Sequence, residues 1–353
     1  MKFSICIPNY NYARYLGRTI QSVLNQQDAE FEVLVSDNAS TDGSPDVVRK
    51  LGDSRIHLHE NVCNVGFSGN LDRAARMATG ECMIMLSSDD LMRAGALSAY
   101  RKLWQHLGPR GATAIASASF DVVDADDQIT GYLGPDKTLW TESDRLPELE
   151  KILGAPVYGV PAGELLRRCL PQMKNPFNFA ATCYASDLYC RVEGYGGGRL
   201  INPDKWFHWK VLGAAEMAYF VDEKLFAYRW HSSNQGSQEN ATGALKYMVD
   251  EYVSTLELDG MVLEKIGLTR EAVAMWFVEN DVARHGLSTL ARGGRVKARR
   301  ILNFGRAVYP QYVRRNPKAW ALAFLLALGP AGQKFAQHAY RSYSQDNPPA
   351  PQH

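Results

Sequence analysis

The chain has 353 residues, of which 46% are hydrophobic and 22% are charged. This composition is ordinary for a globular protein and excludes a disordered, collagen-like or coiled-coil chain. The formal net charge of +1 conceals an uneven distribution: residues 282–345 contain 12 Lys/Arg and no Asp or Glu, whereas the rest contains the other 27 Lys/Arg and all 38 Asp/Glu. The basic segment predicts an anionic partner at that end of the chain.

Neither the first residues nor the cysteines indicate secretion. The apolar run at residues 3–7 ends at Pro8 and is too short for the core of a signal peptide. The six cysteines show no Cys-x-x-Cys spacing, so we interpret them as reduced packing residues. The longest apolar stretch, residues 319–328, would extend about 15 Å as a helix, half of a bilayer core of roughly 30 Å. We therefore expect a cytoplasmic protein without a single-helix membrane span.

Strands and helices alternate along the first 90 residues. The predicted strands are residues 3–7, 31–36, 56–60 and 82–86. The helices predicted between them are residues 15–26, 44–51 and 69–78. This alternation is typical of βαβ units, so we expect an α/β fold with a mostly parallel central sheet flanked by helices. Ligands bind such sheets at the carboxyl ends of the strands.

The pattern is less regular beyond residue 110. Further strands are predicted within residues 113–123, 129–133, 179–189 and 217–228. Residues 134–178 are rich in Pro and Gly and show no clear period, while a helix is predicted at residues 204–212 and further helices from about residue 243 onward. The expected parts are two halves of one α/β domain and a helical C-terminal region, at residues 1–110, 111–235 and 236–353.

Acidic clusters stand where functional loops are expected. Asp37 and the pair Asp89-Asp90 follow predicted strands, and Asp204 opens an aromatic helical run. Adjacent carboxylates repel one another unless a cation lies near them, and they suit Mg²⁺ or Mn²⁺ with diphosphate oxygens completing the shell. The chain has no Walker A and no GxGxxG pattern, so we expect metal to hold the phosphates. Each cluster by itself is also typical of an ordinary polar loop.

A series of short motifs, in order from residue 3 to about residue 235, resembles glycosyltransferase family 2. They are Ser-Ile-Cys-Ile-Pro-Asn-Tyr-Asn at 4–11, Glu-Val-Leu-Val-Ser-Asp-Asn-Ala-Ser-Thr-Asp-Gly at 32–43, Asn-Val-Gly-Phe at 64–67, Ser-Ser-Asp-Asp at 87–90, Glu-Gly-Tyr at 193–195, Pro-Asp at 203–204 and Tyr-Arg-Trp-His at 228–231. The resemblance implies the GT-A fold, a Rossmann-like sheet that binds nucleotide-diphospho-sugars, here with a C-terminal helical extension.

The resemblance also implies a donor site. Its nucleotide-sugar-binding residues would be Pro8, Asn9, Tyr10, Asp37, Asn38, Asn70, Ser88, Asp89 and Asp90. Asp37 would accept from a ring N–H or a sugar hydroxyl, and Asn70 would lie near the base. A divalent cation, Mn²⁺ or Mg²⁺, would be held by Asp89 and by His231. The alternative for His231 is that it only ends the last predicted strand and binds no metal. Ser87 stands where the family usually has an acidic residue, so this metal motif has one carboxylate fewer.

The acceptor half would provide the general base and the residues that contact the acceptor. Asp204 matches the family's general base, although it could instead cap the helix that follows Pro203. Three aromatic residues could stack on the sugar or the acceptor, or could simply pack in the core, namely Trp206, His208 and Trp209.

The basic segment resembles an interfacial membrane anchor. Residues 284–328 combine apolar helical faces with many arginines and end in the apolar stretch containing Trp320 and Phe324. This predicts contact with an anionic membrane surface. The alternative is that these residues form a helical bundle that packs on the acidic remainder of the chain. Binding to nucleic acid is supported by no sequence motif.

The sequence thus predicts an inverting, metal-dependent glycosyltransferase, peripheral on the inner face of the plasma membrane. It would move a sugar from a UDP- or dTDP-sugar to a hydroxyl of a lipid-linked or cell-surface polysaccharide or lipopolysaccharide acceptor. One alternative is a sugar-1-phosphate nucleotidyltransferase, although such enzymes usually open with a Gly- and Arg-rich phosphate loop. Another is a catalytically silent glycan-binding protein on the same fold.

Overall fold

A computed structural model of the chain describes residues 1–27, 30–196, 200, 202–231 and 244–346. The chain divides into two compact units. The first, here the α/β unit, comprises Met1–Cys169 and Lys174–Asn234, and the second, here the helical unit, comprises Leu170–Met173 and Gln235–His353. The expected division of the first unit near residue 110 stays a prediction.

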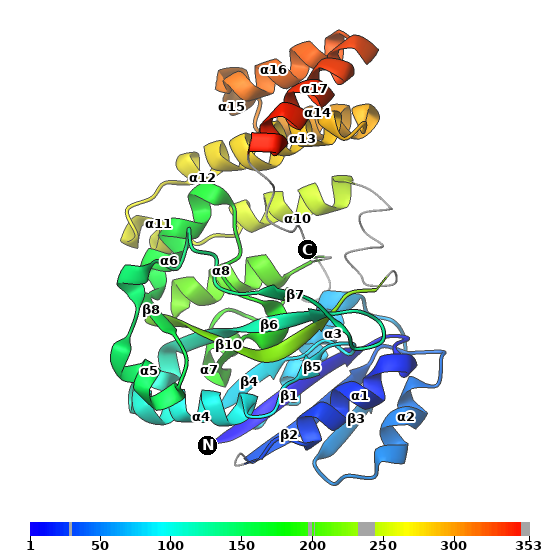
Figure 1. Cartoon of the computed structure of the whole chain (residues 1–353), viewed down its shortest axis with the longest axis vertical. Coiled ribbons are helices and arrows are strands. Elements are labelled where there is room, and N and C mark those ends of the chain that lie inside the picture. Colours follow the sequence, from blue (N-terminus) through cyan, green and yellow to red (C-terminus); the bar gives the residue numbers. More distant parts are fainter. Residues whose placement is uncertain (28–29, 197–199, 201, 232–243, 347–353) are drawn as a thin grey trace. The chain divides into compact units, whose positions relative to one another are not determined.

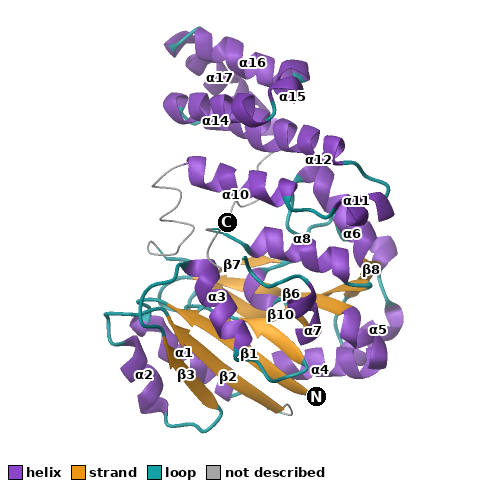
Figure 2. Ribbon diagram, turned by 180° about the vertical axis from the view of Figure 1, so that it is seen from behind, coloured by secondary structure: helices purple, strands orange, loops and turns teal. Residues whose placement is uncertain are grey.

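One mixed sheet of ten strands forms the centre of the α/β unit, with helices packed along it (Figures 1 and 2). The strands are β1 (Lys2–Asn9), β2 (Glu30–Asp37), β3 (Ile56–Glu60), β4 (Cys82–Met85), β5 (Leu91–Met92), β6 (Ala114–Val123), β7 (Ile129–Leu133), β8 (Val157–Pro161), β9 (Cys183–Ala185) and β10 (Met217–Arg229). Their order is β3-β2-β1-β4-β9-β6-β10-β5, with β7 paired to β6 and β8 paired to β10.

The helices of this unit mostly follow the strands. They are α1 (Ala13–Leu24), α2 (Ser44–Leu51), α3 (Phe67–Arg76), α4 (Ala96–Leu107), α5 (Pro147–Leu153), α6 (Ala162–Cys169), α7 (Ser186–Arg191) and α8 (Asp204–Ala214). Helix α1 shows why the sequence folds this way, because its apolar residues Leu16, Ile20 and Val23 recur at helical spacing and are fully buried. The first strands are buried along most of their length, which matches their nearly continuous apolar runs.

Strand direction places the site. β1 pairs in parallel with β2 and β4, β2 with β3, and β6 with β10. β9 pairs antiparallel with both β4 and β6, so β6 and β10 run in the same direction as β1. The carboxyl ends of β1, β2, β4, β6 and β10 therefore lie at one edge of the sheet, which is where parallel sheets bind ligands.

The predicted α/β fold with a helical C-terminal region is confirmed, with local differences. Residues 134–178, which show no sequence period, contain α5, β8 and α6, and the expected strand at 179–189 is only the three-residue β9 followed by α7. These elements are short, and β8 and β9 are defined by pairing with distant strands, which leaves no long repeat in the sequence. All six cysteines are free, and four of them are buried.

The helical unit consists of helices with short connections. They are α10 (Ala244–Leu256), α11 (Gly260–Lys265), α12 (Arg270–Phe277), α13 (His285–Ala291), α14 (Arg295–Val308), α15 (Pro310–Arg315), α16 (Pro317–Ala327) and α17 (Pro330–Asp346). A π-helical segment, Val278–Arg284, joins α12 to α13. Within the described ranges, no helix has both the length and the apolar character needed to cross a membrane.

Candidate active site

The carboxyl edge of the sheet brings together polar residues that are far apart in the sequence. Asn9 ends β1 and Asp37 ends β2, and the two are register partners. Arg229 ends β10 and is the register partner of Val123 at the end of β6. Asp89 lies in the loop that follows β4. The predicted donor residues and the closing strand therefore share one edge.

The carboxylate of Asp37 is held by one donor at the end of β1 and one in the loop that follows β2. The amide Nδ2 of Asn9 donates to Oδ1 at 2.7 Å, and the backbone N–H of Ser40 donates to Oδ2 at 2.8 Å. Each carboxylate oxygen keeps further lone-pair capacity. The Oδ1 atom of Asn9 is buried and has no hydrogen-bond partner among the residues that the structure describes. Two acceptors with spare capacity thus lie side by side at the end of β1 and β2.

Asn38 and Asn70 belong to a network of buried amides beneath this edge. Nδ2 of Asn70 donates to the carbonyl oxygen of Ser36 at 2.9 Å, and Oδ1 of Asn70 accepts from Nδ2 of Asn61 at 2.9 Å. Oδ1 of Asn38 accepts from the backbone N–H of Val65 at 2.9 Å. Both side chains therefore hold the loops that follow β2 and β3, and their contact with a base stays a prediction.

Pro8 and Tyr10 lie at the end of β1. Pro8 is buried, whereas the ring of Tyr10 is exposed directly after Asn9. The next residue, Asn11, has a φ of 60°, and its Oδ1 accepts from the backbone N–H of Thr41 at 2.8 Å. This contact fixes the turn and leaves the aromatic ring of Tyr10 at the surface, where a planar ligand can stack on it.

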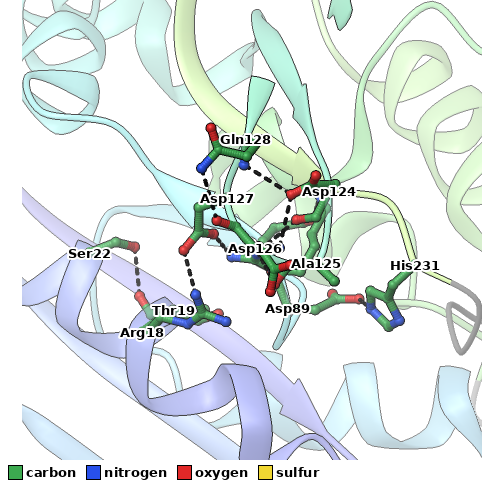
Figure 3. Close-up of polar contacts among 12 residues, drawn as sticks. Arg18, Thr19, Ser22, Asp89, Asp124, Ala125, Asp126, Asp127, Gln128 and His231 are labelled. Carbon is green, nitrogen blue, oxygen red and sulfur yellow. Dashed lines mark hydrogen bonds and ion pairs between the residues drawn. The ribbon is translucent and has the colours of Figure 1, made fainter. Parts of the chain in front are cut away.

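Asp89 and His231 are in direct contact (Figure 3). Nε2 of His231 lies 3.0 Å from Oδ2 of Asp89, and both residues are buried. The imidazole ring packs against the rings of Tyr12 and Tyr15, with centroid distances of 5.8 and 4.7 Å. The aromatic contacts fix the ring plane, so the histidine presents its Nε2 atom toward the carboxylate.

Asp90 lies behind this pair. Its Oδ1 accepts from the backbone N–H of Arg229 at 2.9 Å, and its Oδ2 is buried without a hydrogen-bond partner in the described part of the chain. Burial and the neighbouring charge of Asp89 raise the pKa of the Asp90 carboxyl well above its usual range. Two adjacent buried carboxyl groups are unfavourable when both are ionised, which favours a cation close to them.

Arg229 was not predicted as a site residue, yet its side chain is fully buried between two loops. Nε donates to the carbonyl oxygen of Asp89 at 2.8 Å, and Nη1 donates to that of Asp124 at 3.0 Å. The guanidinium also pairs with the carboxylate of Asp127 and lies over the ring of Tyr15, 5.0 Å from its centroid. Arg229 therefore joins the Asp89 loop to the turn between β6 and β7.

That turn is anchored from two directions. Asp127, whose φ is 68°, pairs with Arg229 and also with Arg18 of α1 (Figure 3). Thr19 of the same helix donates to the backbone carbonyl of Ser88 at 3.0 Å. The signal in the sequence is an arginine at the end of the apolar run 225–228, because a cation in a buried strand must find partners.

The predicted base, Asp204, is the first residue of α8 and is half-buried. Its role as the general base stays a prediction.

The three aromatic residues after Asp204 are all buried. Nε1 of Trp209 donates to the carbonyl oxygen of Lys174 at 2.9 Å, and Nδ1 of His208 lies 2.9 Å from Oδ1 of Asn175. Burial lowers the pKa of His208 to about 3. These contacts and the burial of Trp206 agree with the packing alternative, and stacking of these rings on an acceptor stays a prediction.

The Asp89–His231 pair fits a divalent cation. The carboxylate of Asp89 and the imidazole of His231, which are hydrogen-bonded to each other at 3.0 Å, are both groups that could hold such a cation. A carboxylate with an imidazole suits Mn²⁺ better than Mg²⁺, which prefers oxygen alone. Nowhere in the described ranges do three or more His, Cys, Asp or Glu side chains gather as a metal site. Phosphate oxygens and water would therefore have to supply the other ligands.

Comparison with known proteins identifies the family. The profile of Glycosyl transferase family 2 matches residues 4–152. An uncharacterized glycosyltransferase of Nostoc sp. is 28% identical over 273 residues, which cover 72% of this chain and 75% of that protein. The Escherichia coli UDP-Glc:alpha-D-GlcNAc-diphosphoundecaprenol beta-1,3-glucosyltransferase WfgD is 37% identical over 94 residues, or 27% of this chain and 37% of that protein.

A solved structure shares the fold. The chain superimposes on residues 1–349 of Staphylococcus aureus TarS in complex with UDP-GlcNAc, with a TM-score of 0.66 and 17% sequence identity. The match covers 97% of this chain and 92% of that chain. Together with the motif order and the site at the carboxyl edge of the sheet, these matches show that the chain is a glycosyltransferase with the GT-A fold, whose residues 4–152 form a family 2 domain.

Proposed function

We propose that the protein is an inverting, metal-dependent glycosyltransferase that uses a UDP- or dTDP-sugar as donor. The observation that carries the proposal is the contact between Asp89 and His231 at the carboxyl edge of the sheet. A carboxylate and an imidazole that lie 142 residues apart in the sequence meet at the edge where parallel sheets bind ligands.

The donor nucleotide would occupy the ends of β1 and β2. Asp37 would accept a hydrogen bond from a ring N–H or a ribose hydroxyl through the lone pairs that its contacts with Asn9 and Ser40 leave free. The exposed ring of Tyr10 can stack on the base. Uracil and thymine each present one ring N–H as a donor, which one carboxylate oxygen of Asp37 can accept, so the site is compatible with a uridine or thymidine nucleotide.

Asp89 and His231 would hold the cation, Mn²⁺ in preference to Mg²⁺. When bound, the cation supplies charge neutralisation for the diphosphate that leaves with the electron pair of the C1–O bond. Asp90 would border the sugar. Arg229 would keep Asp89 in place through its backbone carbonyl, and it adds a positive charge beneath the two carboxyl groups.

Asp204 would accept the proton of the acceptor hydroxyl. The acceptor oxygen then forms a bond to C1 of the donor sugar while the bond from C1 to the diphosphate breaks on the opposite face, which inverts the configuration. A residue that takes this proton needs a free lone pair, so Asp204 could not serve as a metal ligand at the same time.

We propose a lipid-linked or cell-surface polysaccharide or lipopolysaccharide saccharide as acceptor. The support is that similar proteins have such acceptors in their names, among them WfgD and a Campylobacter jejuni GalNAc(5)-diNAcBac-PP-undecaprenol beta-1,3-glucosyltransferase. Enzymes with such acceptors work at a membrane, so the protein would be peripheral on the inner face of the plasma membrane, with residues 284–328 as its contact.

A nucleotide screen tests the proposal. Thermal unfolding would be followed with UDP, dTDP, GDP and CMP, each with and without Mn²⁺. A ligand at 100 times its Kd stabilises by about 2.7 kcal/mol, which moves the midpoint by a few degrees. We expect a Mn²⁺-dependent shift with UDP or dTDP that disappears in Asp89→Ala. Folded protein that shifts with none of these nucleotides would contradict the proposal.

A further inference from the structure

Apart from Lys318, whose side chain is 44% exposed and pairs with Glu279, the exposed side chains of helix α16 are apolar. Trp320, Phe324 and Leu328 follow one another at intervals of four residues and lie on one side of the helix, with exposed fractions of 65%, 64% and 48%. The other exposed residues of α16 are Pro317, Ala321 and Ala327. The name "α16 stripe" is used below for Trp320, Phe324 and Leu328.

The opposite side of α16 is also apolar and is buried. Ala319, Leu322 and Leu326 face the interior of the helical unit, where α16 packs against α14 and α17. Beyond Lys318 in its first turn, α16 carries no charged residue, and a helix that is apolar around most of its circumference is normally buried in a large core or in a membrane. The α16 stripe is therefore an interaction surface, because isolated exposed apolar residues are common but a contiguous row is not.

The orientation of Trp320 supports this interpretation. Its Nε1 donates to the backbone carbonyl of Arg314 at 2.7 Å, so the polar atom of the indole is already paired inside the protein. The ring is held at the end of α15 while most of its surface remains exposed. In both ribbon views α16 lies at the margin of the helical unit, on the side away from α10 and α11 (Figures 1 and 2).

The charges around the α16 stripe select the partner. Arg314 and Arg315 directly precede the helix and are exposed, as are Arg299, Arg300 and Arg306 of α14. No Asp or Glu occurs between residues 282 and 345. A second copy of this surface would bring like charges together, whereas an anionic lipid surface offers both apolar depth and negative charge.

Length decides how the helix would lie. Its 11 residues extend about 16 Å, about half of the roughly 30 Å hydrocarbon core, so α16 cannot span a bilayer. We infer that the α16 stripe inserts in the plane of an anionic bilayer surface, with Arg314 and Arg315 at the phosphate level. This deepens the proposed membrane contact of residues 284–328, but it does not depend on the sugar transfer.

The inference also changes which residues make that contact. The sequence suggested the apolar faces of the basic segment as a whole, yet Leu290, Ile301 and Leu302 are buried within the helical unit. These residues pack the bundle and cannot insert without unfolding it. Only α16 combines an exposed apolar face with exposed arginines directly before it in the described part of residues 284–328.

Vesicle binding by the full chain tests the inference. Co-sedimentation would be compared for vesicles of phosphatidylcholine alone and of phosphatidylcholine mixed with phosphatidylglycerol. We expect binding to the mixed vesicles and a loss of at least about tenfold in affinity for the double variant Trp320→Ser/Phe324→Ser. The matched control is Met261→Ser/Met275→Ser, which removes two exposed apolar side chains elsewhere in the helical unit and should bind as the parent does.

Each other outcome is informative. Arg314→Gln/Arg315→Gln should weaken binding and reduce its salt dependence. Equal vesicle binding by the Trp320/Phe324 variant and the parent would overturn the inference. So would a parent protein that is oligomeric, does not bind vesicles, and becomes monomeric in that variant, because the stripe would then join copies of the chain.

The result can be separated from the proposed function. The Trp320/Phe324 variant should keep the Mn²⁺-dependent shift with UDP or dTDP, since these residues belong to the helical unit. A protein that binds vesicles but no nucleotide would overturn the proposed function and leave the membrane contact intact.

Discussion

His231 lies with its Nε2 atom 3.0 Å from Oδ2 of Asp89, although 142 residues separate them in the sequence. The contact exists because β4 and β10 run in the same direction and end at the same edge of the sheet, although β9 and β6 lie between them. Both side chains are buried, and neither lies in a regular strand or helix.

The first prediction concerns this pair. His231→Ala removes one of the two protein ligands proposed for the cation, so the Mn²⁺-supported affinity for UDP or dTDP should fall by at least about tenfold. Calorimetric titration with and without Mn²⁺ measures it. His57→Ala, an exposed histidine on β3, is the control. If the two variants bind with equal affinity, His231 is not a ligand.

Arg229 provides a prediction about stability. Arg229→Met leaves the carbonyl oxygens of Asp89 and Asp124 without their buried donor and removes one of the two arginine partners of Asp127, which should lower the free energy of unfolding by about 1–3 kcal/mol. Arg229→Lys keeps the positive charge but not the forked contacts of the guanidinium. Its free energy of unfolding should therefore lie between those of the parent and Arg229→Met.

Urea unfolding measures both variants of Arg229. Arg49→Met is the control, because Arg49 pairs with Asp46 and Glu60 on the exposed surface, where such pairs contribute at most about 1 kcal/mol. Similar losses in Arg229→Met and Arg49→Met would show that Arg229 does not hold the two loops.

Asp204 provides a prediction about activity. If it takes the proton of the acceptor hydroxyl, Asp204→Asn should lower kcat by about 10²–10⁴-fold and leave the nucleotide-dependent thermal shift unchanged. Asp187→Asn is the matched control, because Asp187 also lies in the first turn of a helix of the α/β unit. A loss of activity that is equal in both variants would show that Asp204 does not take this proton.

His208 provides a prediction about pH. Its pKa is lowered to about 3 by burial, from 6.5, so the unfolded chain binds a proton between these values that the folded chain does not. Stability is therefore fully present above pH 6.5 and is lost as pH falls toward 3, by about 2 kcal/mol at about pH 5.

Urea unfolding at about pH 5 and about pH 8 tests this dependence on pH. In His208→Gln the part of the pH dependence that comes from the imidazole should disappear, whatever the stability of the variant at the higher pH. An unchanged difference between the two pH values would mean that the folded protein accommodates a charged ring at this position.

Much of the site could be predicted from the sequence because it is local. Asp37 and Asp89 directly follow apolar strands, and the carboxyl ends of parallel strands meet at one edge whatever the rest of the chain does. The resemblance to the family motifs then implied a role for each of these residues. Short elements such as β8 and β9 could not be found in this way, because pairing with distant strands defines them.

The sequence by itself determined the alternation of strands and helices, the edge of the sheet that carries the donor residues, and the basic character of residues 282–345. Only the tertiary structure decided that Arg229 is buried between two loops, that Trp206, His208 and Trp209 pack inside, and that the stripe of α16 remains uncovered. The physical reason is burial. The spacing of apolar residues and the charge are properties of a single segment, whereas the exposure of its side chains depends on which other segments pack against it.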